Sequence, residues 1–77
     1  MSSKNVLFKV KYKNDGYLWL VLVEIPDQYV VWDFNNTTNG YFSGHYFTTI
    51  GSAIVKFLKK IEESSLLDID DIEKVVV

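Results

Sequence analysis

The chain has 77 residues and a mass of 8.9 kDa, the size of one small domain. Its composition, 48% hydrophobic, 16% aromatic and 23% charged, excludes a disordered, collagen-like or coiled-coil protein. Because the chain has no cysteine and a single histidine, a disulfide framework, a thiolate nucleophile and an ordinary zinc site are excluded as well. We therefore expect residues 1–77 to form one domain without a cofactor or a bound metal.

The charge pattern limits the partners of the chain. The net charge is −2 and all eight basic residues are lysines, so we expect neither a strong general attraction to duplex DNA nor bidentate arginine contacts. The first residues lack the apolar run of a signal peptide, and the longest apolar run, 17–23, is too short to cross a bilayer. We therefore expect a cytoplasmic protein that does not contact membranes.

Five segments carry a clear periodicity. Alternation of apolar and polar residues predicts β-strands at about 5–13, 17–25, 29–34 and 41–48, and apolar residues spaced by three and four predict an amphipathic helix at about 50–63. Short polar turns between the strands favour antiparallel pairing of neighbours. The expected fold is therefore α+β, a four-stranded antiparallel meander packed on one helix.

The first hairpin has a predicted register. Asp15 and Gly16 have the composition of a two-residue type I′ turn. With these residues at the turn, Val10 lies opposite Val21. A shift of one residue would exchange the two faces of a strand, so this register decides which side chains share a face.

The alternation divides the sheet into two faces. Face A is predicted to hold Val6, Phe8, Val10, Tyr12, Trp19, Val21, Val23, Ile25, Val30, Trp32, Phe34, Phe42 and Tyr46. Face B is predicted to hold Lys9, Lys11, Lys13, Leu18, Leu20, Leu22, Tyr29, Val31, Asp33, Tyr41, His45 and Phe47. Thr48 or Thr49 is expected to cap the N-terminus of the helix. The helix is expected to cover face A, because the side chains of face A are larger than those of face B. Alternation alone leaves the opposite arrangement open.

Gly44 interrupts the fourth predicted strand. A glycine inside a strand marks a bulge or the close approach of a large side chain. We therefore expect Trp32, on the neighbouring strand, to lie across Gly44.

The C-terminal residues 66–77 allow two predictions. Asp68 or Asp70 could cap a short second helix, or residues 73–77 could add an edge strand. The run of three β-branched valines at the end favours the strand.

Face B leads to the main functional hypothesis. If the helix covers face A, the apolar side chains of face B stay exposed, and such a patch normally marks an interaction surface. The chain would then be a small non-enzymatic protein-interaction module, either a homodimer or a small partner or inhibitor of a larger complex. The predicted interaction residues are Leu18, Leu20, Leu22, Tyr29, Val31, Tyr41, His45 and Phe47.

An alternative hypothesis is binding of single-stranded nucleic acid, for which aromatic residues beside lysines on a sheet are typical. The residues concerned are Lys9, Lys11, Lys13, Tyr29 and Tyr41.

No catalytic residue and no small-molecule substrate are predicted. His45 is the one group that titrates near neutral pH, and Ser43 and Asp33 are its nearest candidate helpers, which do not form a recognisable catalytic set. The glycines do not have the spacing of a phosphate-binding loop, and the acidic residues 68–73 do not have the spacing of a calcium loop.

Overall fold

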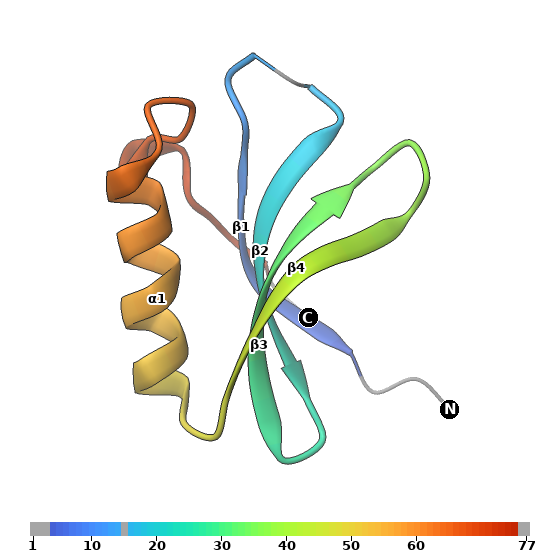
Figure 1. Cartoon of the computed structure of the whole chain (residues 1–77), viewed down its shortest axis with the longest axis vertical. Helices are drawn as coiled ribbons and strands as arrows, with labels where there is room; N and C mark the ends of the chain where they lie inside the picture. Colours follow the sequence, from blue (N-terminus) through green and yellow to red (C-terminus); the bar gives the residue numbers. More distant parts are fainter. Residues whose placement is uncertain (1–3, 15, 76–77) are drawn as a thin grey trace.

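The computed structural model describes residues 4–14 and 16–75 (Figure 1). Its strands form one antiparallel sheet in the order β4-β3-β2-β1-β5, and α1 packs along one side of this sheet. The predicted α+β fold, a four-stranded meander packed on one helix, is confirmed, and a short fifth strand extends it. The elements are β1 (Asn5–Lys11), β2 (Leu18–Ile25), β3 (Gln28–Asn35), β4 (Gly40–Phe47), α1 (Ile50–Glu63), the 3-10 helix η1 (Ile69–Asp71) and β5 (Glu73–Lys74).

Helix α1 begins and ends where its sequence pattern predicts. The side chain of Thr49 accepts a hydrogen bond from the backbone N–H of Ser52 at 3.3 Å, which caps the N-terminus. The buried side of the helix carries Ala53, Phe57 and Ile61. Burial of the two larger side chains contributes about 1.5–3 kcal/mol each before the entropy of ordering them is counted.

The helix covers the leucine side of the sheet, so the prediction that it covers face A is wrong. Leu20, Leu22 and Val31 have no exposed surface and form one core cluster with Phe57 and Ile61 of the helix. The arrangement that alternation left open is therefore the one that forms.

The register of the first hairpin explains this difference. Val10 pairs with Leu20 rather than with Val21, a shift of one residue from the prediction. The connection comprises residues 12–17 instead of a two-residue turn, and Asp15 itself lies outside the described residues. Because a one-residue shift exchanges faces, Phe8 and Val10 of β1 join the leucines under α1, and Lys9 and Lys11 move to the opposite side.

A β-bulge at Leu7 divides β1 between the two sides of the sheet. The pairing changes from Val6 opposite Val23 to Phe8 opposite Leu22, with Leu7 inserted between them. Leu7 and Phe8 both pack against the core beneath α1, whereas Val6 lies on the other side with Val23.

A second irregularity lies in β4 at Ser43 and Gly44. The pairing with β3 is interrupted opposite Trp32, and Ser43 takes a positive φ of 55°. A Cβ at Gly44 would lie 2.5 Å from Nε1 of Trp32, so the predicted close approach of these two residues is confirmed. The bulge also changes the alternation, so that Tyr41 rather than Phe42 shares a face with Trp32.

The C-terminal segment contains both of the elements that the sequence allowed, each of them short. Asp68 caps η1 by accepting a hydrogen bond from the N–H of Asp70 at 3.0 Å. Glu73 and Lys74 then form β5, which pairs with β1. The predicted strand was longer: Val75 lies beyond β5, although its N–H donates to the carbonyl of Leu7 at 3.0 Å, and residues 76–77 lie outside the described residues.

Candidate functional site

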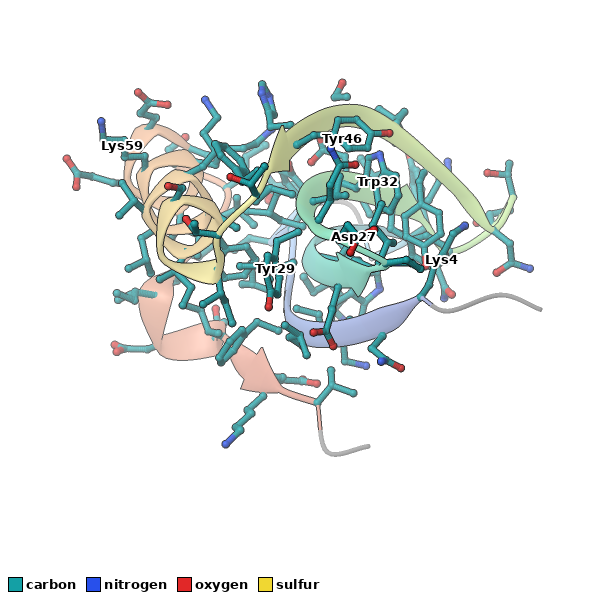
Figure 2. All side chains as sticks on the ribbon, turned by 90° about the horizontal axis from the view of Figure 1, so that it is seen from below. Lys4, Asp27, Tyr29, Trp32, Tyr46 and Lys59 are labelled. Carbon is teal, nitrogen blue, oxygen red and sulfur yellow. The ribbon has the colours of Figure 1, made fainter. Side chains whose placement is uncertain are left out.

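The side of the sheet that faces away from α1 is the candidate site, and we call it the open face. Trp32, Tyr46 and Lys4 lie on this side, whereas Tyr29 lies toward the helix (Figure 2). The pairing of the strands places the following residues on the open face: Val6, Lys9, Lys11, Trp19, Val21, Val23, Val30, Trp32, Phe34, Tyr41 and Tyr46.

Valines form the floor of the open face. Val21, Val23 and Val30 are at most 3% exposed, although α1 lies on the other side of the sheet. Apart from Val6, the other side chains of the open face are larger than these valines, and most of them are aromatic. The open face therefore has its own small apolar layer, topped by aromatic rings.

Five aromatic side chains lie over this floor, and the rings of four of them are in contact. Trp19 pairs with Phe34 across β2 and β3. The ring of Tyr41 lies between those of Phe34 and Trp32, at centroid distances of 4.8 and 4.7 Å. Tyr46 meets Trp32 edge-on at 5.9 Å. This set, which we call the aromatic row, crosses three adjacent strands.

Lysines lie against the aromatic row. The Nζ of Lys4 is 4.6 Å from the ring centroid of Tyr41. The Nζ atoms of Lys9 and Lys11 lie 4.7 and 5.8 Å from the ring centroid of Trp19. These distances are within the range of cation–π attraction, which holds ammonium groups beside the rings and near solvent.

A hollow of about 460 Å³ opens between the rings of Trp19, Phe34 and Tyr41. Val21 lies at its floor, and this volume falls within the usual range of small-ligand sites. Its remaining lining residues are Val6, Lys9, Asn36 and Val75.

The acidic C-terminal segment partly neutralises the lysines of the first hairpin. Glu73 lies 3.8 Å from Lys9, and Asp68 lies 3.4 Å from Lys13. The pKa of Asp68 is lowered by the hydrogen bond from the backbone of Asp70 and by Lys13. Both ion pairs are largely exposed, so each contributes little to stability and can exchange partners.

The structure separates the predicted protein-interaction residues. Leu20, Leu22 and Val31 are fully buried under α1, so they are not accessible to a partner. The prediction that these three residues form an exposed surface followed from placing the helix over face A, and it is wrong because the helix covers the other face. The half-buried residues Tyr29 and Phe47 pack against the same core, Leu18 and His45 are also half-buried, and Tyr41 lies on the open face.

The structure brings together part of the predicted nucleic-acid set. Lys9, Lys11 and Tyr41 share the open face, whereas Tyr29 faces α1 and Lys13 pairs with Asp68. Sequence reasoning missed the open-face roles of Lys4, Trp19, Trp32, Phe34 and Tyr46. For Trp32 and Phe34 the sequence did contain a signal, because the alternation in β3 places these two aromatic residues on the same face of the sheet.

A polar cluster lies at the opposite side, beneath α1. The buried carboxylate of Asp33 accepts a hydrogen bond from Tyr12 at 2.5 Å and one from Lys60 at 3.5 Å. Burial and the neighbouring carboxylate raise the pKa of Tyr12. Burial, and then Lys56 and Lys60, lower the pKa of His45. The partners of Asp33 are Tyr12, the residue that follows β1, and Lys60 of α1, so the cluster ties β3 to the helix and to the end of β1.

Comparison with known proteins adds no further constraint. No protein-family model matches the sequence, and neither the curated proteins nor the solved structures contain a match. Within residues 4–14 and 16–75, no group of three or more histidine, aspartate or glutamate side chains is placed to hold a metal ion. In the same part of the chain, no helix is long and apolar enough to cross a membrane. The candidate site therefore rests on the geometry of the open face.

Proposed function

We propose that this chain is a small non-enzymatic module that binds single-stranded nucleic acid on the open face of its sheet. One observation carries the proposal: lysine ammonium groups lie beside the rings of the aromatic row, on the side of the sheet that α1 leaves uncovered. Lys4 lies over Tyr41 and Lys9 lies over Trp19, at 4.6 and 4.7 Å.

The aromatic row supplies the stacking surface that such a ligand requires. Unpaired bases stack on aromatic rings whatever their sequence, because every base presents a flat π face. Trp19, Phe34 and Tyr41 belong to three neighbouring strands, so successive bases of one strand can lie across the sheet. Duplexes keep their bases stacked on each other, and they are therefore poor ligands for this surface.

The lysines supply contacts to phosphate. Three of them, Lys4, Lys9 and Lys11, contact the aromatic row. For about three phosphate contacts on a single strand, the logarithm of the affinity should fall with the logarithm of the salt concentration with a slope of about −2. The net charge of −2 further limits long-range attraction, so we expect moderate affinity with little sequence preference.

Fluorescence anisotropy of a labelled oligothymidylate tests the proposal. We expect binding at low salt that weakens by about 15- to 20-fold between about 50 mM and about 200 mM salt. Lys9→Gln should weaken binding severalfold. The matched control is Lys59→Gln, which removes the same charge from an exposed position on α1 (Figure 2). Absence of binding at low salt, or equal effects of the two substitutions, would contradict the proposal.

Self-association is a second candidate, favoured by a different observation. The edge strand β4 (Gly40–Phe47) contains no charged residue, and Phe42 and Tyr46 are 46% and 54% exposed. Uncharged edge strands pair readily with another chain, although the bulge at Ser43 and Gly44 shortens the regular edge. This candidate keeps the homodimer hypothesis but moves it from the buried leucines to β4.

Sedimentation at two protein concentrations tests self-association. A dimer that forms through β4 should become monomeric when Tyr46→Lys places a charge on this edge. A strict monomer at high concentration would exclude this candidate and leave nucleic-acid binding unaffected.

A further inference from the structure

We infer that the hollow between Trp19, Phe34 and Tyr41 is a seat for one unstacked nucleobase. The inference rests on the proposed function and makes it more specific, since it assigns one base of the bound strand to a defined place. Three features of the hollow support it: its walls, its charged edge and its amide group.

The walls suit a flat apolar guest. The ring centroids of Phe34 and Tyr41 are 4.8 Å apart and the ring planes are tilted by 45°. The two rings therefore do not stack face to face, and a face of each ring can still receive a guest. Trp19 also lines the hollow, together with the nearly buried Val21. The hollow is larger than one base, so a base can enter it and stack against one of these rings while its sugar and phosphate lie at the mouth.

The edge of the hollow suits an anion. Lys9 lines the hollow, and its Nζ lies 4.7 Å from the Trp19 ring. Its present partner, Glu73, is 3.8 Å away, and both side chains are substantially exposed. A phosphate of the seated nucleotide can therefore replace this carboxylate at low cost.

Asn36 supplies the group that distinguishes a base from an apolar ring. Its backbone N–H donates to the carbonyl of Tyr17 at 2.6 Å, which fixes the start of the β3–β4 loop beside the hollow. Within the described part of the chain, its side-chain amide makes no hydrogen bond. An amide offers both donors and an acceptor, as the hydrogen-bonding edge of a base requires. The tyrosine or tryptophan side chain of a protein partner would not need this combination of amide and cation.

The fluorescence of Trp19 provides a direct readout. The chain has two tryptophans, so Trp32→Phe leaves Trp19 as the sole tryptophan and keeps a ring in the aromatic row. In this background, the protein is titrated with oligothymidylate and with an oligomer of abasic deoxyribose of equal length and charge. We expect the first to quench Trp19 and to bind about tenfold more tightly, and the second to bind without quenching.

Asn36→Ala tests the amide, with Asn5→Ala as the matched control at an exposed position outside the hollow. Asn36→Ala should weaken oligothymidylate binding about three- to tenfold and leave binding of the abasic oligomer unchanged. Asn5→Ala should change neither. Thermal unfolding of both variants separates loss of the site from loss of the fold.

The outcomes distinguish this inference from the proposed function. If oligothymidylate binds but Trp19 is not quenched and Asn36→Ala has no effect, the base seat is wrong and the open-face proposal stands. If neither oligomer binds, the proposed function is wrong and the base seat with it. Quenching by N-acetyltyrosinamide at the same concentrations as by thymidine monophosphate would assign the hollow to an aromatic side chain of a protein partner instead.

Discussion

The hydroxyl of Tyr12 donates a hydrogen bond to Oδ1 of Asp33 at 2.5 Å, across the covered side of the sheet. Asp33 is 8% exposed, and a carboxylate at such burial is costly unless it is paired. Lys60 provides the second contact from α1, at 3.5 Å. The hydrogen bond of Tyr12 therefore makes a buried charge compatible with a core that is otherwise apolar.

Tyr12→Phe should destabilise the fold by about 1.5–3 kcal/mol, because Asp33 would keep one long contact to Lys60 and lose its short one. Urea unfolding near neutral pH measures this loss. Tyr17→Phe is the matched control, since Tyr17 is an exposed tyrosine and its substitution should change stability by less than about 0.5 kcal/mol. Equal effects of the two variants would show that the Asp33 carboxylate does not depend on Tyr12.

The same pair predicts the response to alkaline pH. The pKa of Tyr12 in the folded chain is raised above its ordinary value of 10.0, because burial and the Asp33 carboxylate oppose the phenolate. The stabilisation is therefore complete below pH 10 and is lost as the pH rises beyond it, where the unfolded chain releases the proton first. Urea midpoints between about pH 8 and about pH 11 should fall more steeply for the wild type than for Tyr12→Phe. Parallel curves would contradict this assignment.

Gly44→Ala should destabilise the fold by about 1–3 kcal/mol, because the new Cβ would lie 2.5 Å from Nε1 of Trp32. In a Trp32→Val background the same substitution should cost much less, and this difference is the coupling that a double-mutant cycle measures. Gly51→Ala is the control, since a Cβ there meets no atom within 4 Å and alanine favours the helix. A cost at Gly44 that persists without the Trp32 ring would point to the backbone of β4 instead.

Asp27→Gly should stabilise the chain by up to about 1 kcal/mol. Asp27 follows Pro26 in the turn between β2 and β3 and has a φ of 66°, a region that glycine enters without steric cost. Asp27→Ala should have the opposite effect, because alanine pays the steric cost without the local hydrogen bonding of aspartate. Thermal unfolding of the three proteins gives the order, and alanine more stable than glycine would contradict it.

Glu73→Gln should raise the affinity for oligothymidylate about two- to fivefold, because it releases Lys9 from its carboxylate partner and removes a negative charge beside the hollow. Glu62→Gln makes the same change of charge on an exposed position of α1 and should have a smaller effect. Anisotropy titrations of both variants at low salt measure the difference. An unchanged affinity for Glu73→Gln would mean that Lys9 does not contact the bound strand.

The sequence by itself determined the local features of this protein. The four main strands, the helix at 50–63, a threonine cap at Thr48 or Thr49 and the contact of Gly44 with Trp32 all follow from short-range patterns. Each depends on the chemistry of a few neighbouring residues or on the periodicity within one element, and these were predicted correctly.

The tertiary structure alone decided which sides of the strands belong together. Alternation fixes the relation of residues within a strand, but one residue more in a turn or a bulge inverts the relation to the next strand. The connection at 12–17 and the bulges at Leu7 and Ser43 do this, and they decide which residues of β1 and β4 share a face with the leucines beneath α1. The lysines of β1 thereby lie beside the aromatic row. The register that forms is the one that buries the apolar residues of all strands together, and no single turn determines it.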